Sequence, residues 1–367
     1  MVEKAKISSS QLWLLLFTNV VATGVLFVPA VTTLKGKQDA WLSIAVVATI
    51  FGLLTAIVIS SLAKRFPRET IMDFSISLWG RVLGKIVGLL YMFYFIHSTG
   101  IIVRQFGEFL VTAFMPETPL EVFNLVLVIL AASAVRNGIE VIVRMNQFVI
   151  PLILIIFLGL IVLGIPDWQP EELLPMLEKG WGRVMEASLT PVFWRSQIAL
   201  TLMLIPFLNN HQETRISLIK AVLVIGFILT VETMAAIMIF GNELIVNYVF
   251  PTFYLARYIS IFEFVERLES LIIVVWVAGV TVKVALWYYC AVLAAAQWFQ
   301  LKNHKPVVLP IGVLVLYFSV FLFANTREIV EHLSTQAPFL GLFFTFVVPA
   351  LLWLTAIIRR QGGGKVG

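Results

Sequence analysis

The stretch Thr23-Gly24-Val25-Leu26-Phe27-Val28-Pro29 lies inside an apolar run that extends from Gln11 to Leu34. The run is long enough to cross a bilayer. Pro29 has no backbone N–H, and its ring crowds the carbonyl group four residues earlier, while Gly24 is the residue where a helix unwinds most easily. Unpaired backbone groups at membrane depth are tolerated only where protein buries them or where they line a cavity. We therefore expect the first helix to break here and to help form a small-ligand site.

The composition is that of a polytopic membrane protein. Of the 367 residues, 60% are hydrophobic and 13% are charged, and the mean hydropathy is +0.97. Several apolar runs exceed the roughly 18 residues that indicate a spanning helix. The chain is therefore predicted to be one integral membrane domain (1–367) with ten transmembrane helices. Their approximate ranges are 11–34, 40–63, 85–113, 121–136, 145–165, 189–208, 216–240, 268–298, 307–325 and 338–358.

The basic residues indicate the orientation of the chain. Lys and Arg are more frequent in the loops on the side of the N-terminus than in the loops on the other side, which predicts that both termini are cytoplasmic. We expect no removable signal peptide, because a spanning-length segment follows the short N-terminus without a small-residue cleavage site. The loops 166–188 and 241–269 are predicted to form short interfacial helices. The tail, 359–367, is expected to be disordered.

The sequence excludes several classes of function. The net charge is +5, but no basic run is interleaved with aromatic residues, so we expect no nucleic-acid partner. Cys290 is the only cysteine, which excludes an internal disulfide and a cysteine-built metal site. There is no glycine-rich phosphate loop, no metal-spaced set of ligands and no nucleophile elbow. We expect a protein that is not an enzyme and that needs no cofactor or metal.

Ten spanning segments divide into two halves of five. An odd number of spans in each half makes the second half enter from the opposite side, as in inverted-topology repeats. We place repeat one at about 8–165 and repeat two at about 189–358. The sixth segment should then break like the first, and Pro206 does lie late in its apolar run. The alternative is that each proline only kinks its helix.

Paired breaks suit a zwitterionic ligand. The free N–H groups at the start of a half-helix attract a carboxylate, and free carbonyl groups attract an ammonium. Val25, Leu26, Leu202 and Met203 would line an apolar pocket for the side chain. This lining favours small or medium apolar amino acids.

Lys283 lies near the middle of the eighth segment, where a charge costs several kcal/mol and should face the bundle interior. In one interpretation its ammonium lies against the broken first helix, where related transporters hold a sodium ion. In another it is a structural counter-ion for Glu232 or Glu108, and in a third it reaches the membrane interface. Glu232, in the seventh segment, is a partner for Lys283 or a proton site of its own.

The other polar residues have simpler interpretations. Arg104 and Glu108 are four residues apart on the third segment and can pair locally. Arg195 lies near the start of the sixth segment and is interpreted as interfacial. His97 is expected to be a buried polar residue rather than a titrating relay. Gly100 would let the third segment pass close to a neighbouring backbone or to the ligand.

Several short motifs together resemble those of a known family. These are the start Ile7-Ser8-Ser9-Ser10-Gln11, the stretch 23–29, the exit Lys64-Arg65-Phe66-Pro67, the pair Ile205-Pro206, and Lys283 followed by aromatic residues. From about residue 7 to residue 360, the chain resembles the B subunit of spore nutrient germinant receptors, the GerAB family. That family is similar to amino acid–polyamine–organocation transporters, which implies a LeuT-type 5+5 inverted repeat with helices 1 and 6 broken.

The resemblance implies a ligand site between the first, third, sixth and eighth helices. By position, the site residues are Thr23, Gly24, Val25, Leu26, Gly100, Ile101, Leu202, Met203, Pro206, Val277 and Thr281. Lys283 and Glu232 are the candidates for an internal cation or proton site. Related transporters have a glycine-rich run in the first break, whereas here Ala22-Thr23 precedes Gly24.

Three functions are open at this point. The resemblance implies a sensor that binds a nutrient, with an A subunit and a C lipoprotein as partners in the spore inner membrane. Lys283 and Glu232 favour a proton-coupled amino-acid permease. The third possibility is a structural subunit with a vestigial site. An amino acid is the expected ligand, and the lining residues do not distinguish one apolar amino acid from another.

Overall fold

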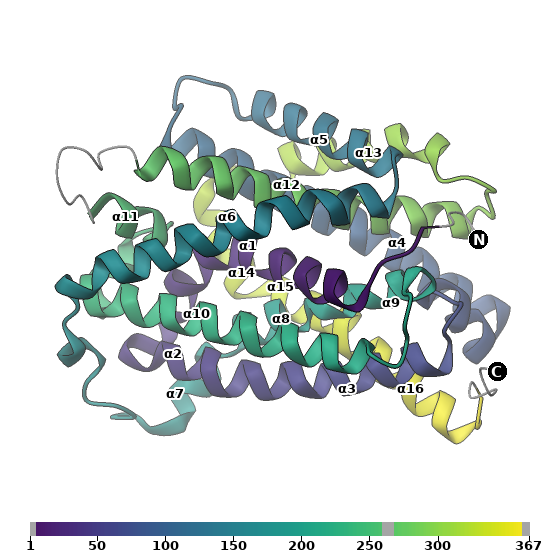
Figure 1. Cartoon of the computed structure of the whole chain (residues 1–367), viewed down its shortest axis with the longest axis horizontal. Coiled ribbons are helices and arrows are strands. Elements are labelled where there is room, and N and C mark those ends of the chain that lie inside the picture. The colour runs from purple at the N-terminus through teal and green to yellow at the C-terminus, as the bar shows by residue number, and fades with distance from the viewer. Residues whose placement is uncertain (1–4, 259–267, 362–367) are drawn as a thin grey trace.

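The computed structural model describes residues 5–258 and 268–361, and this part of the chain is almost entirely helical. The start of α1 and the end of α16 lie toward the same end of the long axis, here named the terminal end, and α7 and α11 lie toward the opposite end (Figure 1). The first half comprises α1 (Ser9–Gly36), α2 (Ala40–Leu42), α3 (Thr49–Arg65), α4 (Ile71–Ala113), α5 (Leu120–Arg136) and α6 (Ile139–Gly164). The second half comprises α7 (Gly180–Ala187), α8 (Leu189–Ser196), α9 (Thr201–Leu204), α10 (Thr214–Leu244), α11 (Pro251–Tyr258), α12 (Leu268–Trp298), α13 (Lys305–Phe321), α14 (Thr326–Ser334), α15 (Gln336–Leu342) and α16 (Val348–Ile358).

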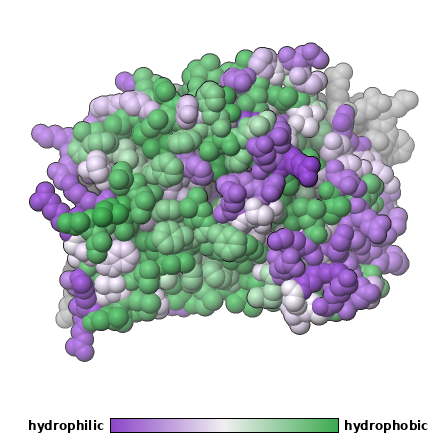
Figure 2. Space-filling view, turned by 180° about the vertical axis from the view of Figure 1, so that it is seen from behind, coloured by the Kyte–Doolittle hydropathy of each residue, from purple (hydrophilic) through white to green (hydrophobic). Residues whose placement is uncertain are grey.

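Every one of the ten predicted segments is helical. Within the described residues, six helical stretches are long and apolar enough to cross a membrane, and the pair α13 and α14, bent by 103°, would be a seventh. The stretch Ser9–Arg65 contains two predicted segments, because a 3₁₀ turn (Lys37–Asp39) separates α1 from α2. The helix α5 has only 17 residues, and the sixth segment is divided into shorter pieces. The surface is that expected of a membrane-spanning protein, since Figure 2 shows hydrophobic residues over the middle and hydrophilic residues mainly toward the two ends.

The helices form two packed groups. In one group, α12 packs most extensively against α4, and α13 and α5 complete it. In the other, α10 packs against α1 and α3, and α8 contacts both of these. The helix α12 is the most enclosed, with every residue from Val280 to Ala296 buried, and it also contacts α1 across the two groups. The peripheral helix α6 lies against α1 and α12.

The first helix corrects our expectation. α1 is continuous from Ser9 to Gly36, with Pro29 inside it, so the prediction that it unwinds at 23–29 is wrong. Pro29 does leave the carbonyl of Val25 without its helical donor, but the hydroxyl of Thr252 in α11 donates to that carbonyl. A freed backbone group that finds a side-chain donor no longer requires the helix to open.

The sixth segment is broken as predicted. After α8, the chain forms a 3₁₀ turn (Gln197–Leu200), then α9, then a second 3₁₀ turn (Ile205–Phe207) that contains Pro206. The break therefore begins near Gln197, well before the proline. The chain that follows is extended, and Ile7 bridges it: the Ile7 N–H donates to the Phe207 carbonyl (2.8 Å), and the Asn209 N–H donates to the Ile7 carbonyl (3.0 Å).

The connecting segments also contain the expected short helices. The predicted interfacial loop 166–188 holds a 3₁₀ turn (Pro170–Leu173) and α7. The loop 241–269 holds α11, and residues 259–267 lie outside the described residues. Most of the predicted disordered tail, 362–367, also lies outside them, while Arg359 is described and donates to the Leu78 carbonyl.

Candidate functional site

A polar cavity of about 40 Å³ lies between α4, α8, α12, α14 and α15. More than half of its lining side chains carry a polar or charged group, which is unusual inside an apolar bundle. These are Tyr94, His97, Ser98, Gln105, Trp194, Gln197, Lys283, Trp287 and His332. The remaining lining residues are Ile101, Ile102, Phe193, Leu333, Ala337, Leu340 and Gly341. The bend between α13 and α14 positions His332 to reach this cavity.

Lys283 is the charged group of the polar cavity. It is 1% exposed, and its ammonium donates to the hydroxyl of Thr23 on α1 at 2.6 Å. Neither carboxylate considered as its partner contacts it, because Glu108 pairs with Arg104 and Glu232 contacts Thr252. Within the described residues Lys283 has no ion pair. Lys283 is therefore a buried cation beside α1 that no anion from the described part of the chain pairs with.

A chain of hydrogen-bonded side chains connects α12, which carries Lys283, to the broken sixth segment. The indole N–H of Trp287 donates to Asn19 Oδ1 (2.7 Å), and Asn19 Nδ2 donates to Gln197 Oε1 (3.4 Å). Gln197 is the residue where the break begins. On the facing helix α4, Gln105 is buried and its Oε1 has no hydrogen-bond partner among the described residues. Sequence analysis missed Asn19, Gln105, Gln197 and Trp287, whose signal is an uncharged polar or indole side chain inside an apolar run.

The predicted site residues are distributed over different places. Ile101 and Lys283 line the polar cavity, and Thr23 contacts Lys283. Val25 and Leu26 line a separate apolar cavity. Pro206 lines a third cavity, of about 280 Å³, at the terminal end.

The other predicted residues line none of these three cavities. Leu202 and Met203 are buried in the core. The Thr281 hydroxyl donates to the Val277 carbonyl within α12 (2.7 Å). A methyl group on Gly24 would lie 3.3 Å from Leu229 of α10, and one on Gly100 would lie 2.6 Å from the Cβ of Phe318 in α13. Gly100 thus permits close helix packing.

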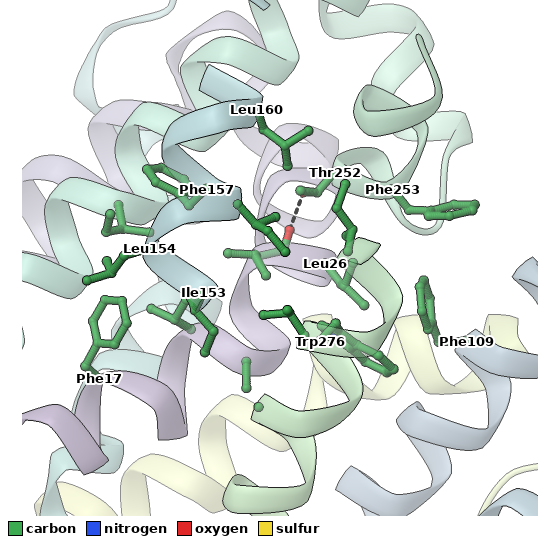
Figure 3. Close-up of a pocket in the computed structure, with 18 residues that line it drawn as sticks. Phe17, Leu26, Phe109, Ile153, Leu154, Phe157, Leu160, Thr252, Phe253 and Trp276 are labelled. Carbon is green, nitrogen blue, oxygen red and sulfur yellow. Dashed lines mark hydrogen bonds between the residues drawn. The ribbon is translucent and has the colours of Figure 1, made fainter. Parts of the chain in front are cut away.

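The apolar cavity has a volume of about 70 Å³ and lies among α1, α6, α11 and α12. Figure 3 shows its carbon-rich wall and the hydrogen bond from Thr252 to Val25. Its lining residues are Phe17, Val21, Ala22, Val25, Leu26, Phe109, Ile153, Leu154, Ile156, Phe157, Leu160, Ile228, Thr252, Phe253, Ile272, Val275, Trp276 and Gly279. No charged residue is among them.

Glu232 is held at the edge of this region. It is buried on α10, and one of its carboxyl oxygens contacts the Thr252 hydroxyl, which also contacts the Val25 carbonyl. A hydroxyl carries one hydrogen, and a carbonyl can only accept. Since Thr252 gives its hydrogen to Val25, the contact with Glu232 is satisfied when the carboxyl is protonated and donates. This arrangement joins α10 to α11 through the carboxyl hydrogen of Glu232 and α11 to α1 through the hydroxyl hydrogen of Thr252.

Arg195 is another correction. It was expected to be interfacial, but it is completely buried between α3, α8 and α10. Its Nη1 donates to the Val222 carbonyl (2.6 Å), while Nε and Nη2 have no partner within the described residues. Gly52 and Gly226 provide the space, because a Cβ at either position would come within 2.6 Å of its side chain. No local pattern around Arg195 indicates that two glycines on other helices enclose it.

Comparison with known proteins agrees with this architecture. A family model described as "Spore germination protein" matches residues 6–327. Spore germination protein KB of Bacillus subtilis (strain 168) is 25% identical, with 98% of this chain and 96% of that protein aligned. Spore germination protein YndE of the same strain is 22% identical, with 98% of each aligned.

A solved structure shares the fold. The crystal structure of MhsT in complex with L-phenylalanine matches with a TM-score of 0.67 at 12% identity, covering 97% of this chain and 99% of that one. This likeness confirms the LeuT-type arrangement. Together with a family model that spans most of the sequence, it shows that the chain belongs to the spore germination protein family and is built as a multi-pass membrane protein with a transporter-like fold.

Proposed function

We propose that this chain is the B subunit of a spore germinant receptor, which binds an amino acid in the polar cavity and signals exit from dormancy. The family supports the role in germination. The neighbouring structure, a complex with L-phenylalanine, supports a small-molecule site in this fold. The observation that carries the proposal is the buried ammonium of Lys283, which has no carboxylate partner among the described residues.

The cavity has complementary groups for a zwitterion. A buried charge without an opposite charge is costly, and the carboxylate of an amino acid would lower that cost by accepting from Lys283. The unpaired Gln105 Oε1 is an acceptor for the ligand ammonium. Both residues line the same cavity, together with the apolar side chains of Phe193 and Leu340.

Signalling requires that the ligand prefer one arrangement of the bundle. The broken sixth segment is the mobile candidate, because Gln197 both lines the cavity and begins the break. Its hydrogen bond to Asn19 connects it to α1. A ligand that orders this connection would bias the sixth segment without any transport step.

Binding by the purified protein tests the proposal. Full-length protein in lipid nanodiscs is titrated with each radiolabelled proteinogenic amino acid in turn. For the best ligand, Lys283→Met should weaken binding about 10- to 100-fold, because a hydrogen bond to a charged group contributes about 1.5–3 kcal/mol. The matched control Lys220→Met replaces an exposed lysine on α10 and should bind like the unchanged protein. Unaltered binding by Lys283→Met would contradict the site.

A germination assay with spores distinguishes a receptor from a structural subunit. Germination is measured against the concentration of the same amino acid in spores whose only copy carries Lys283→Met. A receptor predicts a higher half-maximal concentration at normal protein level. An unchanged concentration dependence favours a scaffold that holds the A subunit and the C lipoprotein, the partners that the family resemblance suggests in the spore inner membrane. The termini would then lie on the core side, and their common end in the structure fits this.

A proton-coupled amino-acid permease is the second candidate. The favouring observation is that two ionisable groups, Lys283 and Glu232, are both buried and both connected to α1. Proteoliposomes with an inward proton gradient should then accumulate the labelled amino acid, and Lys283→Ala should abolish the uptake. Binding without uptake supports the receptor.

A further inference from the structure

The apolar cavity and the polar cavity have no lining residue in common. Among the described residues that line the apolar cavity, the polar side-chain groups are the Thr252 hydroxyl, which already contacts Val25 and Glu232, and the indole N–H of Trp276, which has no hydrogen-bond partner. None of these lining residues is charged, so the ammonium of an amino acid would find no free side-chain acceptor here, and a buried ion without a partner costs several kcal/mol. The chemistry of this wall therefore suits a hydrocarbon better than a zwitterion.

The wall is continuous with the membrane-facing surface. On α6, Ile155 is 66% exposed, while its neighbour Ile156 is half-buried and lines the cavity. On α12, the exposed Val274 adjoins Val275, which lines it. In a bilayer, the molecules that contact Ile155 and Val274 are lipid chains. These chains therefore lie beside the two helices, α6 and α12, that line the cavity.

The dimensions also fit a chain. The lining on α6 extends from Ile153 to Leu160, which is about 10 Å along a helix that rises 1.5 Å per residue. The lining on α1 extends from Phe17 to Leu26, which is about 13 Å by the same rise. Both lengths match several methylene groups of an extended hydrocarbon.

We propose that the apolar cavity binds one acyl chain of a membrane lipid. The chain enters between α6 and α12 and contacts α1 beside Val25. There it packs beneath Thr252 and Phe253 of α11, so an occupied cavity supports the contact between α11 and α1. This site is independent of the nutrient site, and it would make the arrangement of α1 depend on the surrounding bilayer.

Photolabelling tests the site directly. Full-length protein is reconstituted in vesicles of phosphatidylcholine that carries a diazirine in one acyl chain, and labelled residues are mapped by mass spectrometry. The expected result includes labels on Val21 and Leu26 of α1, which are 2% and 3% exposed and can be reached only by a chain inside the cavity. Labels confined to exposed residues such as Leu158 would overturn the proposal.

A matched pair of variants on α6 sharpens the test. Ile156→Trp fills the cavity and should lower labelling of α1 about tenfold, because a close-packed interior leaves no second void of that size. Ile155→Trp faces the bilayer and should leave it unchanged. Ile153→Phe provides a second filling variant if Ile156→Trp does not elute as a single folded species. Equal α1 labelling in the filled variants would contradict the site.

A second labelling experiment distinguishes a lipid acyl chain from a small hydrophobic molecule as the occupant of the cavity. A diazirine-bearing alkyl alcohol is added to vesicles of unlabelled phosphatidylcholine. The lipid proposal holds when the labelled lipid reaches α1. Labelling of α1 by the alcohol and not by the lipid would overturn it in favour of a site for small hydrophobic molecules.

Discussion

The first and the sixth segments both contain a proline late in an apolar run, yet only one of them breaks. α1 passes through Pro29 as a continuous helix, whereas the sixth segment divides around two 3₁₀ turns, the second of which contains Pro206. The difference lies in the surroundings. A hydroxyl from α11 takes the carbonyl that Pro29 frees, while the chain after Pro206 pairs with Ile7 in an extended form. Proline creates an unpaired carbonyl, and the neighbours decide whether the helix opens.

The largest expected effect concerns the bridge beside the broken segment. Ile7 is completely buried, so Ile7→Ala should lower the free energy of unfolding by about 2–5 kcal/mol, the usual cost of such a truncation. Hydrogen–deuterium exchange of the amides at 205–209 should increase, while exchange in the middle of α1 should not. Ile57→Ala, at a partly exposed position on α3, is the control. Equal effects in both variants would contradict the role of the bridge.

A smaller effect concerns the hydroxyl that keeps α1 continuous. Thr252→Val removes the donor to the Val25 carbonyl at nearly constant volume and should cost about 1–3 kcal/mol of unfolding free energy. Pro29→Ala restores a backbone N–H that can donate to the same carbonyl. In that background the cost of Thr252→Val should be lower, and denaturation of the four proteins measures the coupling. Strictly additive costs would show that Thr252 does not compensate for Pro29.

The smallest effect concerns Glu232. If its carboxyl donates to Thr252, Glu232→Gln keeps a donor and should cost less than about 1 kcal/mol, whereas Glu232→Leu leaves the partner unsatisfied and should cost about 1–3 kcal/mol. Thermal unfolding of the two variants in nanodiscs compares them. Equal losses for Gln and Leu would contradict a stabilising hydrogen bond between this carboxyl and Thr252.

The sequence predicted the ten helices because each apolar run must bury its own backbone groups in the membrane. The break in the sixth segment was predicted from the division into two halves of five and from the position of Pro206. The continuity of α1 was not predicted, because the compensating hydroxyl of Thr252 is 227 residues away from Val25 in a short helix between two spans. Local sequence shows which carbonyl loses its helical donor, but it does not show which distant side chain donates a hydrogen bond to that carbonyl.

Prediction of the candidate site from local sequence has the same limit. Lys283 could be identified because a charge in an apolar run is visible in the sequence. Its surroundings could not, since His332 reaches the polar cavity through the bend between α13 and α14. Arg195 was misplaced for a related reason, because Gly52 and Gly226 enclose it from two other helices. Contacts between segments that are distant in the sequence determine both the surroundings of Lys283 and the burial of Arg195.

The hydrogen bond from Thr252 to Val25 also has a consequence for populations. That bond supplies about 1–3 kcal/mol of the free energy that separates the continuous helix from its opened form. Losing it would raise the population of the opened form about 5- to 150-fold. Displacing α11 would therefore increase the fraction of opened α1 at a distance, and an event at one end of the bundle could be registered in its middle.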